Sequence, residues 1–357
     1  MSQVRYREPQ ICKSALDPLQ DVVSWLRGLK SQAYTSEILA AKHKQNDANK
    51  LRNCSRAISS HVEVAMELLD QAFSGSSRTS YLPIYYSMLN LAKTVVLAKG
   101  WIDELGEQRQ HGAGWTGVSR QSHDLLTDQI TVHERGAIAL YYSALVGHLW
   151  PNTSQRNRNG NWRSTPKRSL SLRDIYPYIA SIGFEFTNVY GIPGGFEGVD
   201  VSITQHKHGK WRAEVQFPRP SQPINTIRRQ IKLLSGLNYD SGKYVSKSVS
   251  ASSEEDARTA LEGGLRWFLL YPEIHESEFY TMTPRSMSNF MFPEEIPVLL
   301  AFFHLGNVVR YDPERLERLF DSRCCGILEI LRRHGTYDYL LAVWSYMMQQ
   351  QVAPVRT

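Results

Sequence analysis

Cysteine is scarce in this chain of 357 residues, which contains only four. No two of them form a C-x-x-C pair. The adjacent Cys324 and Cys325 are poorly spaced for a common disulfide or for a zinc site. A chain without a disulfide framework or a zinc motif fits a reducing compartment. We therefore expect a cytoplasmic protein.

Long apolar runs are also missing. The longest, near residues 296–303, is far shorter than the roughly 20 residues that a bilayer-spanning helix needs. The first ten residues lack the apolar stretch of a secretory signal. We expect no membrane partner, and we interpret 296–303 as part of a core helix.

The sequence contains no recognisable signature of a metal site, a cofactor site or a hydrolase active site. The chain has no H-E-x-x-H or G-x-S-x-G motif. The glycine-rich stretch 191–198 is not followed by G-K-[ST], so a phosphate-cradling loop is not indicated. His206 and His208 share a strand face, but no neighbouring acid or thiol completes a metal site. We expect neither a metal nor a cofactor.

Positive charge exceeds negative charge, giving a formal net charge of +6. Arginine outnumbers lysine by about two to one, and its planar fork suits phosphate and carboxylate. Residues 151–172 are basic, contain one tryptophan and look like an exposed loop. Such a loop is either a solvated linker or a site that pairs with phosphates and stacks on bases. The candidate nucleic-acid-binding residues are Arg156, Arg158, Trp162, Arg163, Lys167 and Arg168.

The strongest local pattern is a helix over 81–100. Pro83 lies in its first turn, Ser80 is placed to cap it, and Gly100 is placed to end it. The helix is apolar around most of its girth, which is typical of a central helix packed on several sides. Its narrow polar wedge consists of Ser87, Asn90, Lys93 and Thr94.

The remaining patterns predict an α+β protein, mostly α, in which helical N- and C-terminal parts flank a small antiparallel sheet. Helices are expected at 16–30, 36–73 (one or two), 134–149, 172–182, 294–310, 314–320, 326–334 and 337–350. Strands are expected at 184–190, 199–206, 211–217, 244–250 and 266–271. The predicted parts are a helical part at 1–150, the basic loop at 151–172, a small α+β part at 173–285 and a C-terminal helical part at 286–357.

The stretch SYLPIYYSMLNLAKTVVLAKG, with the later QHGAGW, resembles the helical hairpin of HEPN domains. The matching residues are Tyr85, Tyr86, Ala92, Gly100 and His111. The whole chain resembles the YaaC-like family, which adds a C-terminal helix similar to FHLGNVVRYDPERLERLF. The residues that carry this second match are Leu305, Arg310, Tyr311, Pro313 and Glu314.

The HEPN resemblance implies a function on RNA. Catalytic HEPN members use an R-x(4–6)-H motif to cleave RNA through its 2′-hydroxyl, and the only such spacing here joins Arg56 to His61. His111, in a turn beside Gly112, is a second candidate; its alternative role is packing or capping. We therefore name His111, Arg56 and His61 as candidate catalytic residues. The expected activity is binding or metal-independent cleavage of RNA or single-stranded nucleic acid in a bacterial defence or stress system.

Two other function classes stay open: a non-catalytic interaction subunit of a larger multi-subunit complex, and an enzyme of another type. An exposed apolar patch would favour the first, and a closed pocket with perturbed carboxylates the second. Asp124 and Asp128 have the spacing of a solvated helix, while His304 is expected to serve structure and Arg310 to clamp two helices.

Overall fold

The computed structural model describes most of the chain. The described residues are 10–14, 17–42, 47–107, 110–117, 124–146, 168–192, 194–206, 209–217, 238–240, 243–254, 256–257, 260–261, 268–271, 278–282, 293–348 and 352–356. The chain forms two compact units. The helical unit comprises Leu19–Gly194 and Phe292–Met347, and the sheet unit comprises Met1–Pro18, Gly195–Met291 and Met348–Thr357.

The helical unit begins with a series of helices. They are α1 (Pro18–Gly28), α2 (Gln32–Lys42), α3 (Ala48–Ser74), α4 (Tyr81–Leu97), α5 (Ile102–Glu107) and α6 (Ala137–Val146). The predicted 36–73 segment is thus two helices. The second begins at Asp47, whose carboxylate accepts hydrogen bonds from the backbone N–H groups of Asn49 and Lys50.

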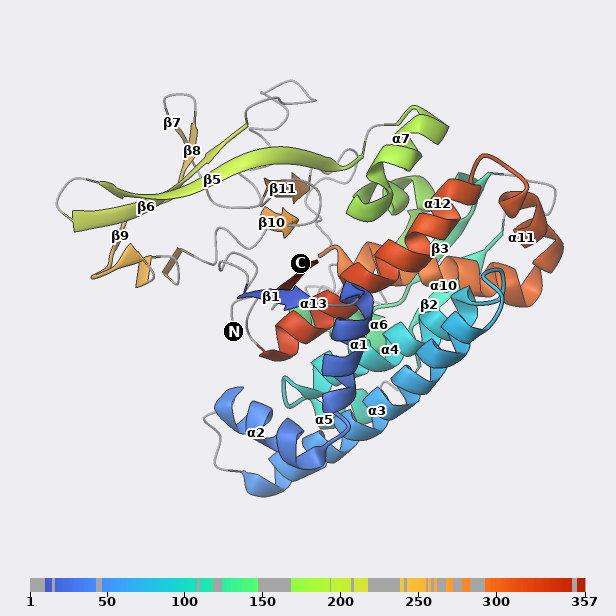
Figure 1. Cartoon of the computed structure of the whole chain (residues 1–357), viewed down its shortest axis with the longest axis horizontal. Coiled ribbons are helices and arrows are strands. Elements are labelled where there is room, and N and C mark those ends of the chain that lie inside the picture. Colours follow the sequence, from blue (N-terminus) through green and yellow to red (C-terminus); the bar gives the residue numbers. More distant parts are fainter. Residues whose placement is uncertain are drawn as a thin grey trace, which may run out of the picture. The chain divides into compact units, whose positions relative to one another are not determined.

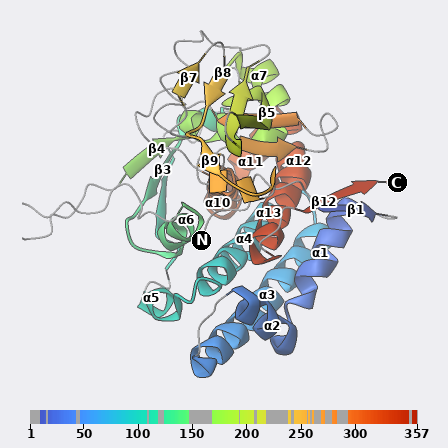
Figure 2. The ribbon, with the colours of Figure 1, turned by 90° about the vertical axis from the view of Figure 1, so that its left-hand side faces the viewer.

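Helix α4 is the centre of the helical unit, as predicted. It packs against α3, α6 and α10 (Glu295–Tyr311), and it lies side by side with α3 (Figures 1 and 2). Leu89 is 5% exposed and Leu91 is fully buried. Gly100 follows the helix with a φ of 80°. The prediction for Ser80 is wrong, because its hydroxyl donates to the carbonyl of Ser77 and caps no helical N–H.

A three-stranded antiparallel sheet completes this half of the unit. Its strands are β2 (Ala113–Thr116), β3 (Gln129–Val132) and β4 (Arg168–Ser171), in the order β2-β3-β4. Two strands lie where none was predicted, since β2 falls between the helices expected at 81–100 and 134–149, and β4 falls at the end of the expected basic loop. Both strands hydrogen-bond to β3.

The segment from 172 to 190 is wholly helical in character. Short 3-10 helices occupy 172–182, and α7 (Gly183–Tyr190) replaces the strand predicted at 184–190. The alternation of aromatic residues at Phe184 and Phe186 had wrongly indicated a strand. Phe186 is fully buried and packs on Tyr190, one helical turn later, with ring centroids 5.0 Å apart, whereas Phe184 is 74% exposed.

The C-terminal part of the helical unit runs from α10 through α11 (Pro313–Phe320), α12 (Cys325–Ile330) and the π-helix η6 (Leu331–Gly335) to α13 (Thr336–Met348). Asp312 caps α11 as predicted, its carboxylate accepting the N–H of Arg315. The break predicted at Gly335 is instead a π-helical turn. An added Cβ at Gly335 would lie 2.7 Å from Cδ1 of Leu331, so a larger residue there would require the leucine side chain to move.

The sheet unit is built on the antiparallel hairpin of β5 (Phe196–His206) and β6 (Lys210–Gln216) (Figure 1), which confirms the predicted pair. The other strands are β7 (Asn238–Asp240), β8 (Lys243–Val245), β9 (Val249–Ser250), β10 (Phe268–Tyr271) and β11 (Glu278–Met282). Their order is β10-β11-β5-β6-β8-β7, with β9 beside β6. Val199, Ala213, Val215, Tyr244 and Leu261 form the core of this unit.

A separate parallel pair in the sheet unit joins β1 (Gln10–Ser14) to β12 (Val352–Arg356). The α+β class with a predominance of helix is confirmed. The division into four parts at 150, 172 and 285 stays a prediction. Among the described helices, none combines the length and hydropathy that crossing a bilayer requires.

The burial of α4 predicts a large cost for truncating its core. Replacing Leu89 with Ala should lower the free energy of unfolding by about 2–5 kcal/mol, because it removes buried methyl groups and leaves a cavity. Chemical denaturation of the whole chain measures the change. Val64→Ala on α3 is the control, since Val64 is 44% exposed. Equal losses for the two variants would contradict the central role of α4.

Candidate functional site

The two helices at the centre of the unit bring His61 to the polar wedge of α4. His61 lies on α3, and its Nδ1 is 2.8 Å from Oδ1 of Asn90 on α4. The amide nitrogen of Asn90 donates to the carbonyl of Tyr86 at 2.8 Å, which fixes the orientation of this side chain. His61 and Asn90 are both half-buried. The predicted catalytic histidine therefore lies half-buried between α3 and α4.

His111 lies in a tightly held turn between α5 and β2. The backbone carbonyls of Gln110 and His111 accept hydrogen bonds from Ala137 and Ile138 at the start of α6, at 2.9 and 3.2 Å. Gly112 has a φ of 76°, and an added Cβ would lie 2.5 Å from an opposing backbone carbonyl oxygen. Only glycine fits there. The turn thus caps α6 through its backbone and leaves the imidazole for other contacts.

The imidazole of His111 is held on both sides. Its Nδ1 accepts a hydrogen bond from the N–H of Ala113 at 3.1 Å. Its ring packs against Phe303 of α10, with centroids 5.5 Å apart. His111 as a whole residue is half-buried.

The ammonium of Lys93, one turn after Asn90 on α4, acts on both histidines. Burial is the main cause of a lowered pKa for His61, and the charge of Lys93 adds to it while the hydrogen bond to Asn90 opposes it. Burial also lowers the pKa of His111, followed by the charges of His133 and Lys93. Burial lowers the pKa of Lys93 itself. We call His61, Asn90, Lys93, His111 and His133 the Lys93 cluster.

The cluster adds three residues that sequence reasoning missed as site residues. Asn90 and Lys93 were visible as the polar wedge of an otherwise apolar helix, and that wedge was the available signal. His133 directly precedes the turn into α6, and its backbone N–H donates to the carbonyl of Gly112 at 2.7 Å. No pattern in the sequence distinguishes it.

Arg56 is not brought to the cluster by α3. A separation of five residues turns about 140° around a helix, so Arg56 and His61 point in different directions. Arg56 is exposed. Its proposed catalytic role stays a prediction.

The candidate nucleic-acid-binding residues lie almost entirely outside the described part of the chain. These are Arg156, Arg158, Trp162, Arg163 and Lys167. Arg168 begins β4, where its backbone is paired with Val132. Nucleic-acid binding by this segment stays a prediction.

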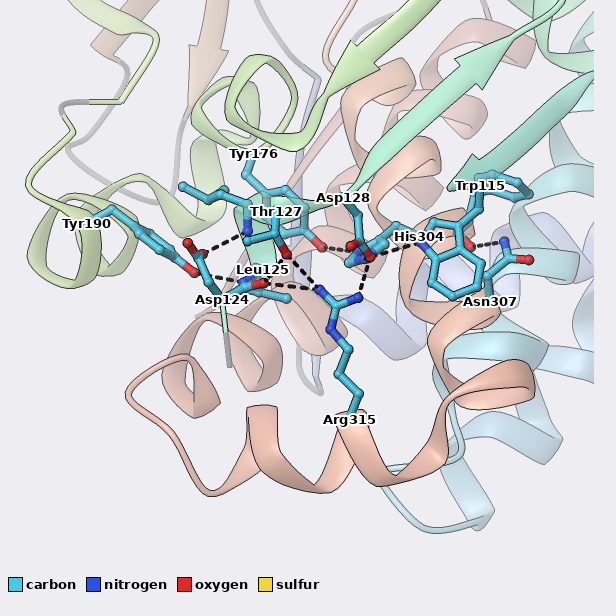
Figure 3. Close-up of polar contacts among 12 residues, drawn as sticks. Trp115, Asp124, Leu125, Thr127, Asp128, Tyr176, Tyr190, His304, Asn307 and Arg315 are labelled. Atoms are coloured by element: carbon cyan, nitrogen blue, oxygen red, sulfur yellow. Dashed lines mark hydrogen bonds and ion pairs between the residues drawn. The ribbon is translucent and has the colours of Figure 1, made fainter. Parts of the chain in front are cut away.

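A second cluster, buried at its centre, is built around Asp128 (Figure 3). Oδ2 of its carboxylate accepts hydrogen bonds from Nε1 of Trp115 at 2.9 Å, Nε2 of His304 at 2.9 Å and Nη1 of Arg315 at 2.6 Å. Nδ1 of His304 then accepts the hydroxyl of Tyr176 at 3.1 Å. The side chains of Asp128, His304 and Arg315 are at most 1% exposed. We call these five residues the Asp128 network.

Arg315 has further partners within the same fold. Its Nη2 donates to the carbonyl of Asp124 at 3.1 Å and to the hydroxyl of Thr127 at 3.2 Å. Burial alone would raise the pKa of Asp128, but hydrogen bonds from His304, Arg315 and Trp115 outweigh it and hold that pKa well below its usual range. The carboxylate and the guanidinium therefore balance each other, and His304, whose pKa is lowered mainly by burial, stays neutral.

Two expectations from the sequence are corrected by this network. Asp124 and Asp128 do not lie on a solvated helix, since Asp124 caps a short 3-10 helix (Leu125–Thr127) and Asp128 follows it in buried, extended backbone. Arg310 is exposed, with its guanidinium over the ring of Tyr311 at 5.1 Å. The arginine that clamps separate elements is Arg315. His304 has the structural role that was expected.

The two clusters differ in how far their side chains are exposed to a ligand. In the Asp128 network the side chains of Asp128, His304 and Arg315 are closed to solvent, and they hold separate elements together. The Lys93 cluster is only half-buried, and it contains imidazoles and an ammonium that can meet a ligand. Within the described ranges, no group of three or more His, Cys, Asp or Glu side chains is arranged to hold a metal ion.

Removing the charge of Asp128 should be costly. Asp128→Asn leaves Arg315 buried without its counter-ion, so we expect a loss of about 3–5 kcal/mol in the free energy of unfolding. Because the folded pKa is depressed, the contribution is full above the unfolded pKa of about 3.9 and is lost as pH falls through the folded pKa. The difference between wild type and variant should therefore narrow in strong acid.

Denaturant titrations at neutral and acidic pH measure both effects. Asp70→Asn is the control, because Asp70 pairs with Arg27 at the surface and such exposed pairs contribute about 1 kcal/mol or less. If Asp128→Asn costs no more than Asp70→Asn at neutral pH, the network does not stabilise the fold as described.

Comparison with known proteins defines the family. No curated protein and no solved structure is significantly similar to the chain. The family described as YaaC-like Protein matches residues 27–325. This match covers most of the chain and includes both the Lys93 cluster and the Asp128 network. The chain therefore belongs to the YaaC-like family.

Proposed function

We propose that this YaaC-like protein binds RNA and cleaves it without a metal ion, with His61 and His111 as catalytic residues and Arg56 as an exposed phosphate contact. One observation carries the proposal. The two imidazoles come from segments far apart in the sequence, yet both contact the packed pair of helices α4 and α10: Nδ1 of His61 is 2.8 Å from Asn90 of α4, and the ring of His111 packs against Phe303 of α10.

The chemistry of RNA cleavage fits such a set of groups. A base removes the proton of the 2′-hydroxyl, the 2′-oxygen attacks phosphorus, and the 5′-oxygen leaves with a proton. Positive charge stabilises the extra negative charge that develops on the phosphoryl oxygens. Imidazoles with lowered pKa are neutral near pH 7 and are able to accept a proton. DNA lacks the 2′-hydroxyl and should not be cut.

The wider context of the proposal is a cytoplasmic one. The scarcity of cysteine fits a reducing compartment. The basic segment, with Arg156 and Arg163 near Trp162, would hold the RNA strand through phosphate pairing and stacking. We place the activity in bacterial defence or stress, as the HEPN resemblance implies.

Cleavage in the presence of EDTA tests the proposal. We expect single-stranded RNA to be cut to 2′,3′-cyclic phosphate ends, while DNA of the same sequence stays intact. His61→Ala and His111→Ala should each slow cleavage about 100-fold or more, because general acid–base groups contribute 10²–10⁴-fold. His334→Ala is the control, since His334 is exposed on η6.

Unchanged cleavage in both variants would reject these histidines as catalytic residues. Intact RNA with the wild-type protein, alone or with a co-purifying partner, would reject the nuclease. The protein would then be better described as a non-catalytic interaction subunit of a larger complex.

RNA binding by the basic segment is a separate prediction. Affinity for a single-stranded oligonucleotide should fall several-fold between about 50 and 200 mM salt, because phosphate pairing releases counterions. A quadruple alanine variant should weaken binding uniformly across sequences, since phosphate contacts carry no base information. The residues replaced are Arg156, Arg158, Arg163 and Arg168.

Fluorescence anisotropy measures these affinities. A matched quadruple variant removes four exposed arginines from the helical unit, namely Arg27, Arg52, Arg323 and Arg333. If both quadruple variants bind RNA with the same affinity as the wild type, the basic segment is only a linker.

A further inference from the structure

We infer that Tyr311, at the end of α10, is a stacking site for one base of a single-stranded nucleic acid. Trp115 of β2 supports the tyrosine ring, and Arg310 supplies positive charge for the adjoining phosphate. The inference deepens the proposed function, because it names where a base of the bound RNA would stack. It is tested on DNA, which the proposed nuclease does not cut.

The ring of Tyr311 is exposed to solvent. Tyr311 is the last residue of α10 and is 58% exposed. Among the described residues of α10, α11 and the β2–β4 sheet, no other large apolar side chain is exposed. A stable protein interface buries about 800 Å² on each partner, so a single exposed ring is too small a surface for one. It has the size of one planar ligand.

Trp115 supports this ring from within the fold. The two rings are nearly parallel, with an interplanar angle of 12° and centroids 6.4 Å apart, within the range of aromatic pairs. Nε1–H of Trp115 donates to the buried carboxylate of Asp128 at 2.9 Å (Figure 3). Gly117 lies against the indole, since an added Cβ there would be 2.9 Å from Cζ2 of Trp115. A platform that is already held in place loses little conformational entropy when a ligand stacks on it.

Arg310 adds a positive charge to the platform. The centre of its guanidinium lies 5.1 Å from the centroid of the Tyr311 ring. Arg310 is exposed, and no described residue forms an ion pair with it. The two acids that follow it have other partners, because Asp312 caps α11 and Glu314 pairs with Arg318 at 3.9 Å. The guanidinium is therefore available to pair with a phosphate.

A nucleotide combines the two features that this surface would bind. Its base is planar and stacks on an aromatic ring, and its phosphate pairs with a guanidinium. Every base has a π-face, so the site should tolerate any sequence and should accept DNA as well as RNA. A duplex hides the faces of its bases, so a single strand should bind more tightly.

Fluorescence anisotropy of the whole chain with a short single-stranded DNA tests the inference, with an abasic strand of the same length beside it. Tyr311→Ala should weaken binding of the base-bearing strand about 5-fold to 100-fold, the range measured for loss of one stacked base. It should leave binding of the abasic strand unchanged. Tyr311→Phe keeps the ring and should retain the affinity of the wild type.

Two further variants complete the test. Arg310→Ala should weaken binding of both strands, because a phosphate contact does not depend on the base. Phe184→Ala is the control, since Phe184 is a 74% exposed aromatic residue on α7, and it should bind both strands like the wild type.

The outcomes separate the inference from the proposed function. Base-dependent loss of affinity in Tyr311→Ala, together with intact RNA, would keep the stacking site and reject the nuclease. Wild-type affinity in Tyr311→Ala, or equal losses on the base-bearing and abasic strands, would overturn the stacking site even if RNA is cleaved. Loss of a co-purifying protein from Tyr311→Ala, with unchanged DNA affinity, would also overturn it and assign the ring to a protein interface.

Discussion

The carboxylate of Asp128 is buried, and the donors that stabilise it come from three separate parts of the chain. Trp115 belongs to β2, His304 to α10 and Arg315 to α11. A buried charge without such partners would be strongly unfavourable, so the three elements must meet at one point for the unit to fold. Tyr176 completes the arrangement by donating to the far side of His304.

This constraint extends to the Lys93 cluster through short links. Trp115 is tied to Asp128, and its strand starts at Ala113, whose N–H holds the imidazole of His111. On the other side, Phe303 packs on that imidazole and directly precedes His304 in α10. The closed network therefore fixes the backbone on both sides of His111. The buried Asp128 network thus supports the half-buried Lys93 cluster. Buried supporting residues of this kind can hold reactive side chains in a fixed geometry.

Local patterns in the sequence predicted the parts of the fold that depend on local physics. The apolar girth of 81–100 identified α4, the Asp312–Pro313 pair identified the start of α11, and alternation identified the β5–β6 hairpin. The polar wedge of α4 pointed to Asn90 and Lys93 without indicating their use. Where two periodicities fitted one stretch, as at 184–190, burial of Phe186 against Tyr190 decided for helix.

Contacts between residues far apart in the chain could not be predicted from the sequence. The spacing of Asp124 and Asp128 is typical of a solvated helix, and nothing in it indicates that Asp128 meets an arginine 187 positions later. The close approach of Gly112 and Gly136, which shapes the His111 turn, is likewise visible only in three dimensions. The sequence allowed His61 and His111 to be named as candidates, but it did not indicate that the charge of Lys93 acts on both of them.

The central claim is that the Lys93 cluster receives the phosphate backbone of RNA. The most direct measurement is an NMR titration of the whole chain with a short RNA in which one 2′-hydroxyl is replaced by hydrogen, so that it binds but is not cut there. The account predicts that the ring signals of His61 and His111 shift together as this RNA binds. Binding that is evident from the oligonucleotide's own signals, with both imidazoles unchanged, would contradict it.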